Sequence, residues 1–144
     1  MTDPLLVTRK LAVLREHLAR LRRRRPGSLD ELRGDVDRID AIAMSVVVAV
    51  QEAIDVAFHV ASDEGWGMPA TYREGFELLS AKGWISSELA DQLGGAARLR
   101  NRIAHGYATI DVGVLWQELP AGIAAFEAFA AAIATKLIEQ QPAP

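Results

Sequence analysis

Residues 35–62, with the sequence DVDRIDAIAMSVVVAVQEAIDVAFHVAS, decide the fold class of this chain. The stretch contains no glycine or proline, and apolar side chains such as Ile42, Val46 and Ile54 recur at helical spacing. Val46, Val47 and Val48 alone would suit a strand, because β-branched residues favour extended backbone. The flanking 3.6-residue periodicity outweighs that preference. The sequence therefore predicts a long helix in the core of a bundle.

Apolar stripes and start and stop signals predict further helices on both sides of this segment. A leucine stripe predicts a first helix over about residues 4–24, which Pro26 and Gly27 end, and a short turn of helix is expected near residues 29–32. The string TYRE at 71–74 has the form of a capping box and starts a short helix that Gly83 ends. The leucine stripe consists of Leu11, Leu14, Leu18 and Leu21.

The C-terminal third of the chain predicts two more helices. Ser86 or Ser87 caps a helix that continues through Ile103, and Asp111 caps the last helix, which runs to about residue 140. Pro120 is expected to kink this last helix or to split off its first two turns. With 144 residues and no long linker, the chain is expected to form one domain over 1–144, an all-α, up-and-down bundle of four to five helices.

Composition excludes several classes of site. The chain has no cysteine, so a disulfide, a thiol nucleophile and a thiolate metal site are ruled out. Neither a His/Asp/Glu trio at ligand spacing nor a glycine-rich phosphate loop is present, so no metal and no cofactor are expected. No secretory signal opens the chain, and the longest apolar run, 41–50, is about half the ~20 residues that span a bilayer. We therefore expect a cytoplasmic protein without a membrane segment.

The net charge of −3 is unevenly distributed along the chain. Residues 1–38 carry ten Lys/Arg against six Asp/Glu, whereas the remainder carries six against thirteen. A basic cluster in the first helix can attract RNA phosphates by releasing counterions. It can equally complement the dipole at a helix C-terminus, and the sequence leaves both interpretations open. The cluster consists of Arg20, Arg22, Arg23, Arg24 and Arg25.

The string RNRIAHGY at 100–107 gathers the side chains best suited to phosphodiester chemistry. Arg100 offers a planar fork of donors to phosphate oxygens, and His105 exchanges protons near neutral pH. On an unbroken helix these two residues lie ~140° apart around the axis, so they do not share a face. Either the helix ends near Ala104 and Gly106 swings His105 round, or a second subunit completes the site across a two-fold axis.

The same string resembles the Arg–(four to six residues)–His signature of the HEPN superfamily. The extended pattern, Arg-Asn-x-x-x-His-Gly-Tyr followed by Ile110 and Asp111, is similar to its HepT-like branch, the toxin half of HepT–MntA toxin–antitoxin pairs. The resemblance is strongest over about 35–140. It includes QEAID at 51–55 with His59, PATYRE at 69–74 and KGWI at 82–85.

The resemblance implies a homodimeric, metal-independent endoribonuclease with the Arg-x4-His motif near the two-fold interface. Arg100 and His105 would be the catalytic pair, acting on an RNA substrate, while Asn101 would orient the imidazole or the backbone. The resemblance also implies a cognate minimal nucleotidyltransferase antitoxin as partner. Tyr107 would either bind phosphate or accept AMP from that partner. The alternative is a non-catalytic HEPN module that pairs with a nucleotidyltransferase and assists nucleotide binding.

Overall fold

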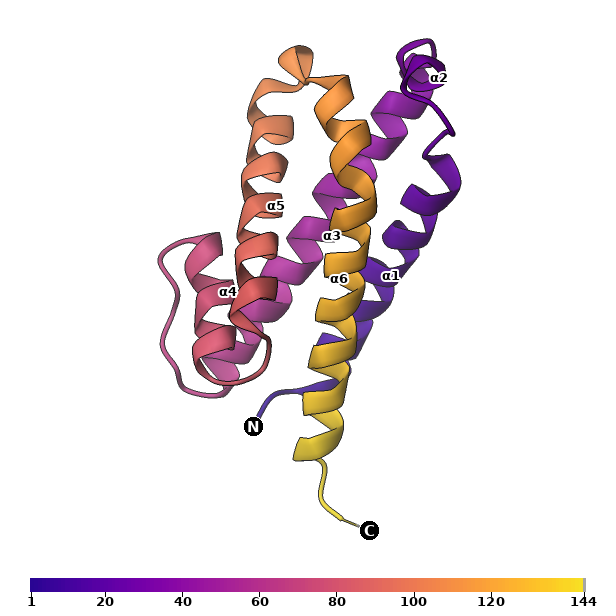
Figure 1. The fold of residues 1–144 in the computed structure, drawn as a ribbon. Coiled ribbons are helices and arrows are strands. Elements are labelled where there is room, and N and C mark those ends of the chain that lie inside the picture. The colour runs from indigo at the N-terminus through magenta and orange to yellow at the C-terminus, as the bar shows by residue number, and fades with distance from the viewer. Residues whose placement is uncertain (144) are drawn as a thin grey trace.

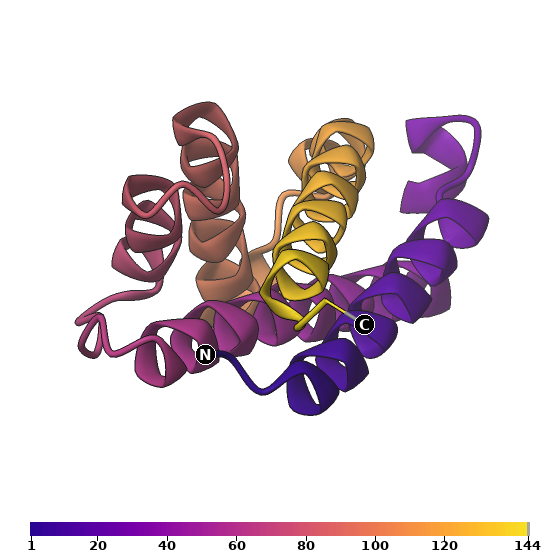
Figure 2. The same cartoon turned by 90° about the horizontal axis from the view of Figure 1, so that it is seen from below.

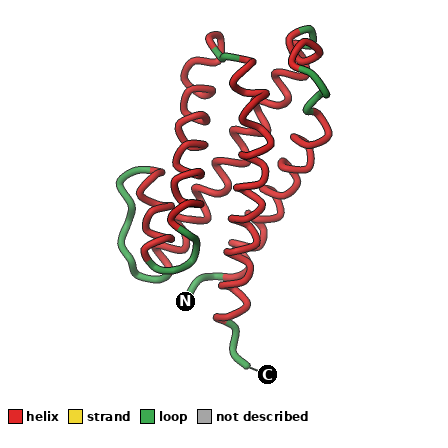
Figure 3. Tube along the Cα trace, in the orientation of Figure 1, coloured by secondary structure: helices red, strands yellow, loops and turns green. Residues whose placement is uncertain are grey.

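The chain folds into an all-helical bundle whose long helices alternate in direction (Figure 1). The computed structural model describes residues 1–143, and within that range every element is helical or a loop (Figure 3). The prediction of an all-α, up-and-down bundle is confirmed, and residues 1–143 contain six α-helices, four long and two short, where four to five were expected. The elements are α1 (Pro4–Arg24), α2 (Leu29–Arg33), α3 (Val36–Asp63), α4 (Tyr72–Ala81), α5 (Ser87–Gly106), the 3₁₀ turn η1 (Tyr107–Thr109) and α6 (Val112–Gln140).

The predicted caps account for where the helices begin and end. The Thr71 hydroxyl accepts the N–H of Glu74 at 3.1 Å, so Thr71 caps α4 as predicted, while the Glu74 carboxylate accepts the N–H of Ala70, one residue before the position that a capping box uses. Ser86, not Ser87, caps α5, and Asp111 caps α6 as predicted. Gly83 ends α4 in the left-handed region at a φ of 79°. This conformation lets the next N–H, that of Trp84, return to the Leu79 carbonyl, which is a Schellman closure.

The core lies between a two-helix layer and the helices that stand on it. Figure 2 shows α1 and α3 side by side as one layer, with α4, α5 and α6 packed on one side of that layer. Phe76 from α4 and Phe129 from α6 are fully buried and meet edge to face with ring centroids 5.9 Å apart. Ile42 and Ile54 of α3 are also fully buried. The segment 35–62 is therefore the central core helix that its periodicity predicted.

Helix α6 continues through Pro120, so the expected split of its first two turns does not occur. Proline has no N–H, which leaves the Trp116 carbonyl without its usual helical donor. Arg25 replaces that donor: its Nε lies 3.1 Å from the Trp116 carbonyl oxygen, and its guanidinium lies 4.0 Å from the centroid of the Trp116 ring. The indole Nε1 in turn donates to the Pro26 carbonyl at 3.2 Å. One arginine of the basic cluster thus has a structural task.

Helices α3 and α6 are long and apolar enough to cross a membrane by length and composition alone. Both contribute apolar side chains to the buried core of the bundle, among them Val50 and Ile54 of α3 and Phe129 and Ile133 of α6. In the middle of α3, Gln51 and Asp55 are bonded to residues of neighbouring helices. We therefore interpret α3 and α6 as core helices of the bundle.

Candidate active site

Helix α5 carries both residues of the signature on one continuous helix. It ends at Gly106 rather than near Ala104, so the expected swing of His105 around Gly106 is not found. Arg100 is directed toward α3, whereas His105 is exposed to solvent. The ~140° separation expected for five helical residues therefore holds. Within one chain, the two side chains occupy different faces of α5.

Arg100 is partly buried and held from two sides. Its Nη2 donates to Gln51 Oε1 on α3 at 3.0 Å, and its Nη1 donates to Asn101 Oδ1 at 3.2 Å. The guanidinium carbon lies 5.9 Å from the centroid of the Tyr72 ring. The third donor, Nε, is buried and has no hydrogen-bond partner among residues 1–143. These contacts restrict the guanidinium to one orientation.

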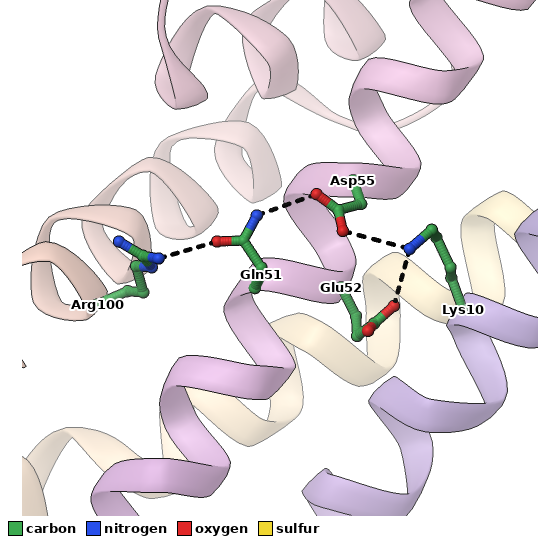
Figure 4. Close-up of polar contacts among 5 residues, drawn as sticks. All are labelled: Lys10, Gln51, Glu52, Asp55 and Arg100. Atoms are coloured by element: carbon green, nitrogen blue, oxygen red, sulfur yellow. Dashed lines mark hydrogen bonds and ion pairs between the residues drawn. The ribbon is translucent and has the colours of Figure 1, made fainter. Parts of the chain in front are cut away.

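The contacts of Arg100 continue into a polar network that joins α5, α3 and α1 (Figure 4). Gln51 Nε2 donates to Asp55 Oδ1 at 3.0 Å, and Lys10 Nζ donates to Asp55 Oδ2 at 3.2 Å. Lys10 also forms an ion pair with Glu52 at 3.5 Å. Burial alone would lower the pKa of Lys10, but the hydrogen bond to Asp55 and the charges of Glu52 and Asp55 together raise it. Lys10 is therefore firmly protonated.

Sequence reasoning did not assign these network residues to the site. The i, i+4 spacing of Gln51 and Asp55 places them on one face of α3, which is a signal that the sequence contains. Lys10 lies 45 residues from Asp55. Nothing in the local pattern around Lys10 indicates that it reaches α3 at this point.

His105 lies beside an open groove at the C-terminal end of α5. The groove has a volume of about 660 Å³ and includes Asn101, Arg102, His105 and Asp111 in its lining. Arg100 does not line it. Asn101 and His105 share this face, as their spacing of four predicts. The side-chain amide oxygen of Asn101, however, accepts a hydrogen bond from Arg100. No hydrogen bond between Asn101 and the imidazole occurs in the described part of the chain.

Tyr107 opens the 3₁₀ turn η1 directly after α5 and is 45% exposed. Gly106, which precedes it, lines the groove together with His105. The phenol is therefore accessible to a second protein that approaches this end of the bundle.

Comparisons with known proteins assign the chain to a family. The family model described as "Ribonuclease HepT-like" matches residues 14–133. The chain is 23% identical to the mRNA nuclease HepT of Shewanella oneidensis over 124 residues, 86% of this chain and 92% of the relative. It is 28% identical to the tRNA nuclease HepT of Aphanizomenon flos-aquae over 109 residues, 76% of this chain and 74% of the relative.

A solved structure supports the fold. The tri-AMPylated HEPN toxin of Shewanella oneidensis, in complex with its MNT antitoxin, superimposes with a TM-score of 0.84 at 23% identity. The alignment covers 94% of this chain and 99% of the toxin. The sequence resemblance, the helical architecture and the family model agree. The chain therefore belongs to the HepT-like ribonuclease family.

Proposed function

We propose that this protein is a toxin-type, metal-independent endoribonuclease of the cytoplasm. The observation that carries the proposal is the match to the HepT-like ribonuclease model over residues 14–133. Two relatives of the chain are named as mRNA and tRNA nucleases, which makes RNA the expected substrate. The exposed imidazole beside a groove gives such a substrate a place to bind.

In this proposal, cleavage uses the ribose 2′-hydroxyl as the nucleophile. His105 accepts the proton of that hydroxyl or returns a proton to the leaving 5′-oxygen, and such general acid–base catalysis contributes about 10²–10⁴-fold. Arg100 binds the scissile phosphate and stabilises the charge that develops on its non-bridging oxygens. The products are a 2′,3′-cyclic phosphate and a free 5′-hydroxyl. Substrates without a 2′-hydroxyl are not cleaved.

The proposal includes a homodimer, because Arg100 and His105 diverge within one chain. A two-fold interface repeats every contact, so packing α5 near the axis brings the Arg100 of one protomer toward the His105 of its partner. Each of the two sites then contains one residue from each protomer.

We further propose that a cognate minimal nucleotidyltransferase antitoxin neutralises the enzyme by transferring AMP to Tyr107. The AMP group adds bulk and negative charge beside the groove, where a substrate phosphate must lie. The AMPylated toxin in the similar structure, bound to its MNT antitoxin, supports this form of control. The exposure of Tyr107 is consistent with an acceptor role.

The test of the nuclease is cleavage of cellular RNA in the presence of EDTA. The wild-type protein is expected to produce 2′,3′-cyclic phosphate ends. Arg100→Ala and His105→Ala are each expected to lose about a hundredfold or more of the rate. Arg9→Ala and His17→Ala serve as matched controls, because they change the same residue types on α1, outside the basic cluster. Cleavage that survives both site substitutions would exclude this mechanism.

The test of the acceptor is the intact mass of the toxin after incubation with the nucleotidyltransferase and ATP. The wild-type chain is expected to gain the mass of AMP, and Tyr107→Phe is expected to gain none. An unchanged wild-type mass, or modification that persists in Tyr107→Phe, counts against Tyr107 as the acceptor.

One observation favours the alternative, a non-catalytic module that pairs with a nucleotidyltransferase and assists nucleotide binding. In a single chain the Arg100 guanidinium is engaged by Gln51 and Asn101 and does not line the groove of His105. The EDTA assay separates the two functions. A module binds its partner and leaves RNA intact, whereas the enzyme binds its partner and also cleaves RNA.

A further inference from the structure

We propose that Gln51 is a positioning residue that orients Arg100 while leaving its positive charge available to the substrate. This inference rests on the proposed function and extends it to α3. Within residues 1–143, Gln51 is the only α3 residue whose side chain hydrogen-bonds the Arg100 guanidinium, and that side chain is a neutral amide. Asp55, the first carboxylate along the network, is bonded to the Gln51 NH₂ group and not to Arg100.

The chemistry of the network allows one orientation of the Gln51 amide. Arginine has only donors and an ionised carboxylate has only acceptors. The amide must therefore present its oxygen to Arg100 and its NH₂ group to Asp55, as the two bonds of 3.0 Å show. Lys10 holds Asp55 in place from the other side. A charged pair on α1 and α3 thus orients an amide that in turn orients a guanidinium on α5.

The neutrality of Gln51 matters because a guanidinium that is directly paired with a carboxylate has its charge compensated. An RNA phosphate would then compete with that carboxylate for the same donors. Asp55 is instead bonded directly to Lys10, which also contacts Glu52, and the Gln51 amide separates Asp55 from Arg100. The hydrogen-bond partners of Arg100 are thus two neutral amide oxygens, which orient the guanidinium without pairing it directly with a carboxylate. If Arg100 had a purely structural role, nothing would require an amide between it and the Asp55 carboxylate.

A charge exchange within the network tests the proposal directly. The double variant Gln51→Glu/Asp55→Asn retains an acceptor facing Arg100, a donor between positions 55 and 51 and an acceptor facing Lys10. It also retains the total charge, but moves the negative charge next to Arg100. We expect an unchanged thermal midpoint and a kcat/KM that falls roughly tenfold, mainly through KM, because phosphate binding is weakened.

Removal of the amide tests the orienting part of the proposal. Gln51→Leu is expected to lower kcat/KM by about ten- to a hundredfold, because the guanidinium is no longer held in place. Asp63→Asn is the matched control for the change at Asp55. Asp63 also lies on α3, and it accepts the N–H of Asp3 instead of joining the network. This control is expected to stay within about twofold of wild type. Cleavage at the wild-type rate by either the charge-exchange variant or Gln51→Leu would overturn the proposal.

A second readout separates this inference from the proposed function. In ¹⁵N-labelled protein, the Arg100 Nε–H signal is expected to exchange slowly with solvent in the wild type, because Nε is buried. It is expected to exchange faster in Gln51→Leu and to stay slow in Asp63→Asn. Failure of the wild type to cleave RNA would reject the nuclease and leave this readout intact. An exchange rate that does not change in Gln51→Leu would reject the positioning role whatever the activity.

Discussion

Arg100 and His105 lie five residues apart on one helix, yet their surroundings are opposite. Arg100 is bonded to Gln51 and Asn101 and lies next to the Tyr72 ring. His105 is exposed beside a groove at the end of the same helix. Because the guanidinium is already ordered in the free protein, substrate binding does not cost the conformational entropy of ordering it. The signature thus combines a fixed residue with an accessible one, and the two depend on the fold to different degrees.

The largest expected effect comes from combining the two site variants in one dimer. Arg100→Ala and His105→Ala protomers, co-expressed with different tags, form a mixed dimer that can be purified. If each site takes one residue from each protomer, the mixed dimer contains one intact site and recovers about half of the wild-type RNA cleavage. Each homodimeric variant is expected to be inactive. An inactive mixed dimer would mean that both residues of a site come from one chain.

The next largest effect is on the free energy of unfolding, where we expect Arg100 and His105 to differ. Arg100→Ala leaves the amide oxygen of the partly buried Gln51 side chain without its Arg100 donor and is expected to cost about 1–3 kcal/mol of unfolding free energy. His105→Ala removes an exposed side chain and is expected to stay within about 0.5 kcal/mol of wild type. Urea denaturation measures both. Equal losses in the two variants would contradict the distinction between a held and an accessible residue.

The basic cluster of α1 permits the same comparison between a held and an accessible cation. Arg25→Gln removes the donor to the Trp116 carbonyl that Pro120 leaves free, and is expected to cost about 1 kcal/mol. Arg23→Gln changes an exposed side chain and is expected to have almost no effect on stability. Thermal unfolding of the two variants at equal ionic strength checks this. A cluster that serves only to attract RNA would instead show equal stabilities and a weaker salt dependence of RNA binding in both variants.

The smallest expected effect concerns His17, which is partly buried, in contrast to the exposed His105. Burial, and then the charge of Arg20, lower the pKa of His17 in the folded protein. The unfolded chain therefore binds a proton more readily, and folding stability falls as the pH drops below the unfolded value of about 6.5. His17→Gln should remove that part of the pH dependence, so the variant is expected to lose less stability than the wild type between pH 7.5 and 5.5. Parallel pH profiles for wild type and variant would refute it.

Local chemistry made most of the fold predictable. The caps at Thr71, Ser86 and Asp111 act over three or four residues, and the apolar periodicity of 35–62 depends only on neighbouring turns of one helix. The expected split at Pro120 was wrong, because the compensating donor, Arg25, is the residue that follows α1, 91 residues before Trp116. A local rule for proline does not include such a distant partner.

The candidate site divides along the same line. The order of residues by itself determined that Arg100 and His105 stand five positions apart, and therefore on different faces of a helix. Only the tertiary structure decided that this helix continues to Gly106. It also decided that Gln51 holds Arg100, and that Lys10 and Asp55 orient the Gln51 amide. The physical reason is that helical spacing follows from backbone hydrogen bonds within one segment. The partners of the partly buried Arg100 guanidinium depend instead on how three separate helices pack together.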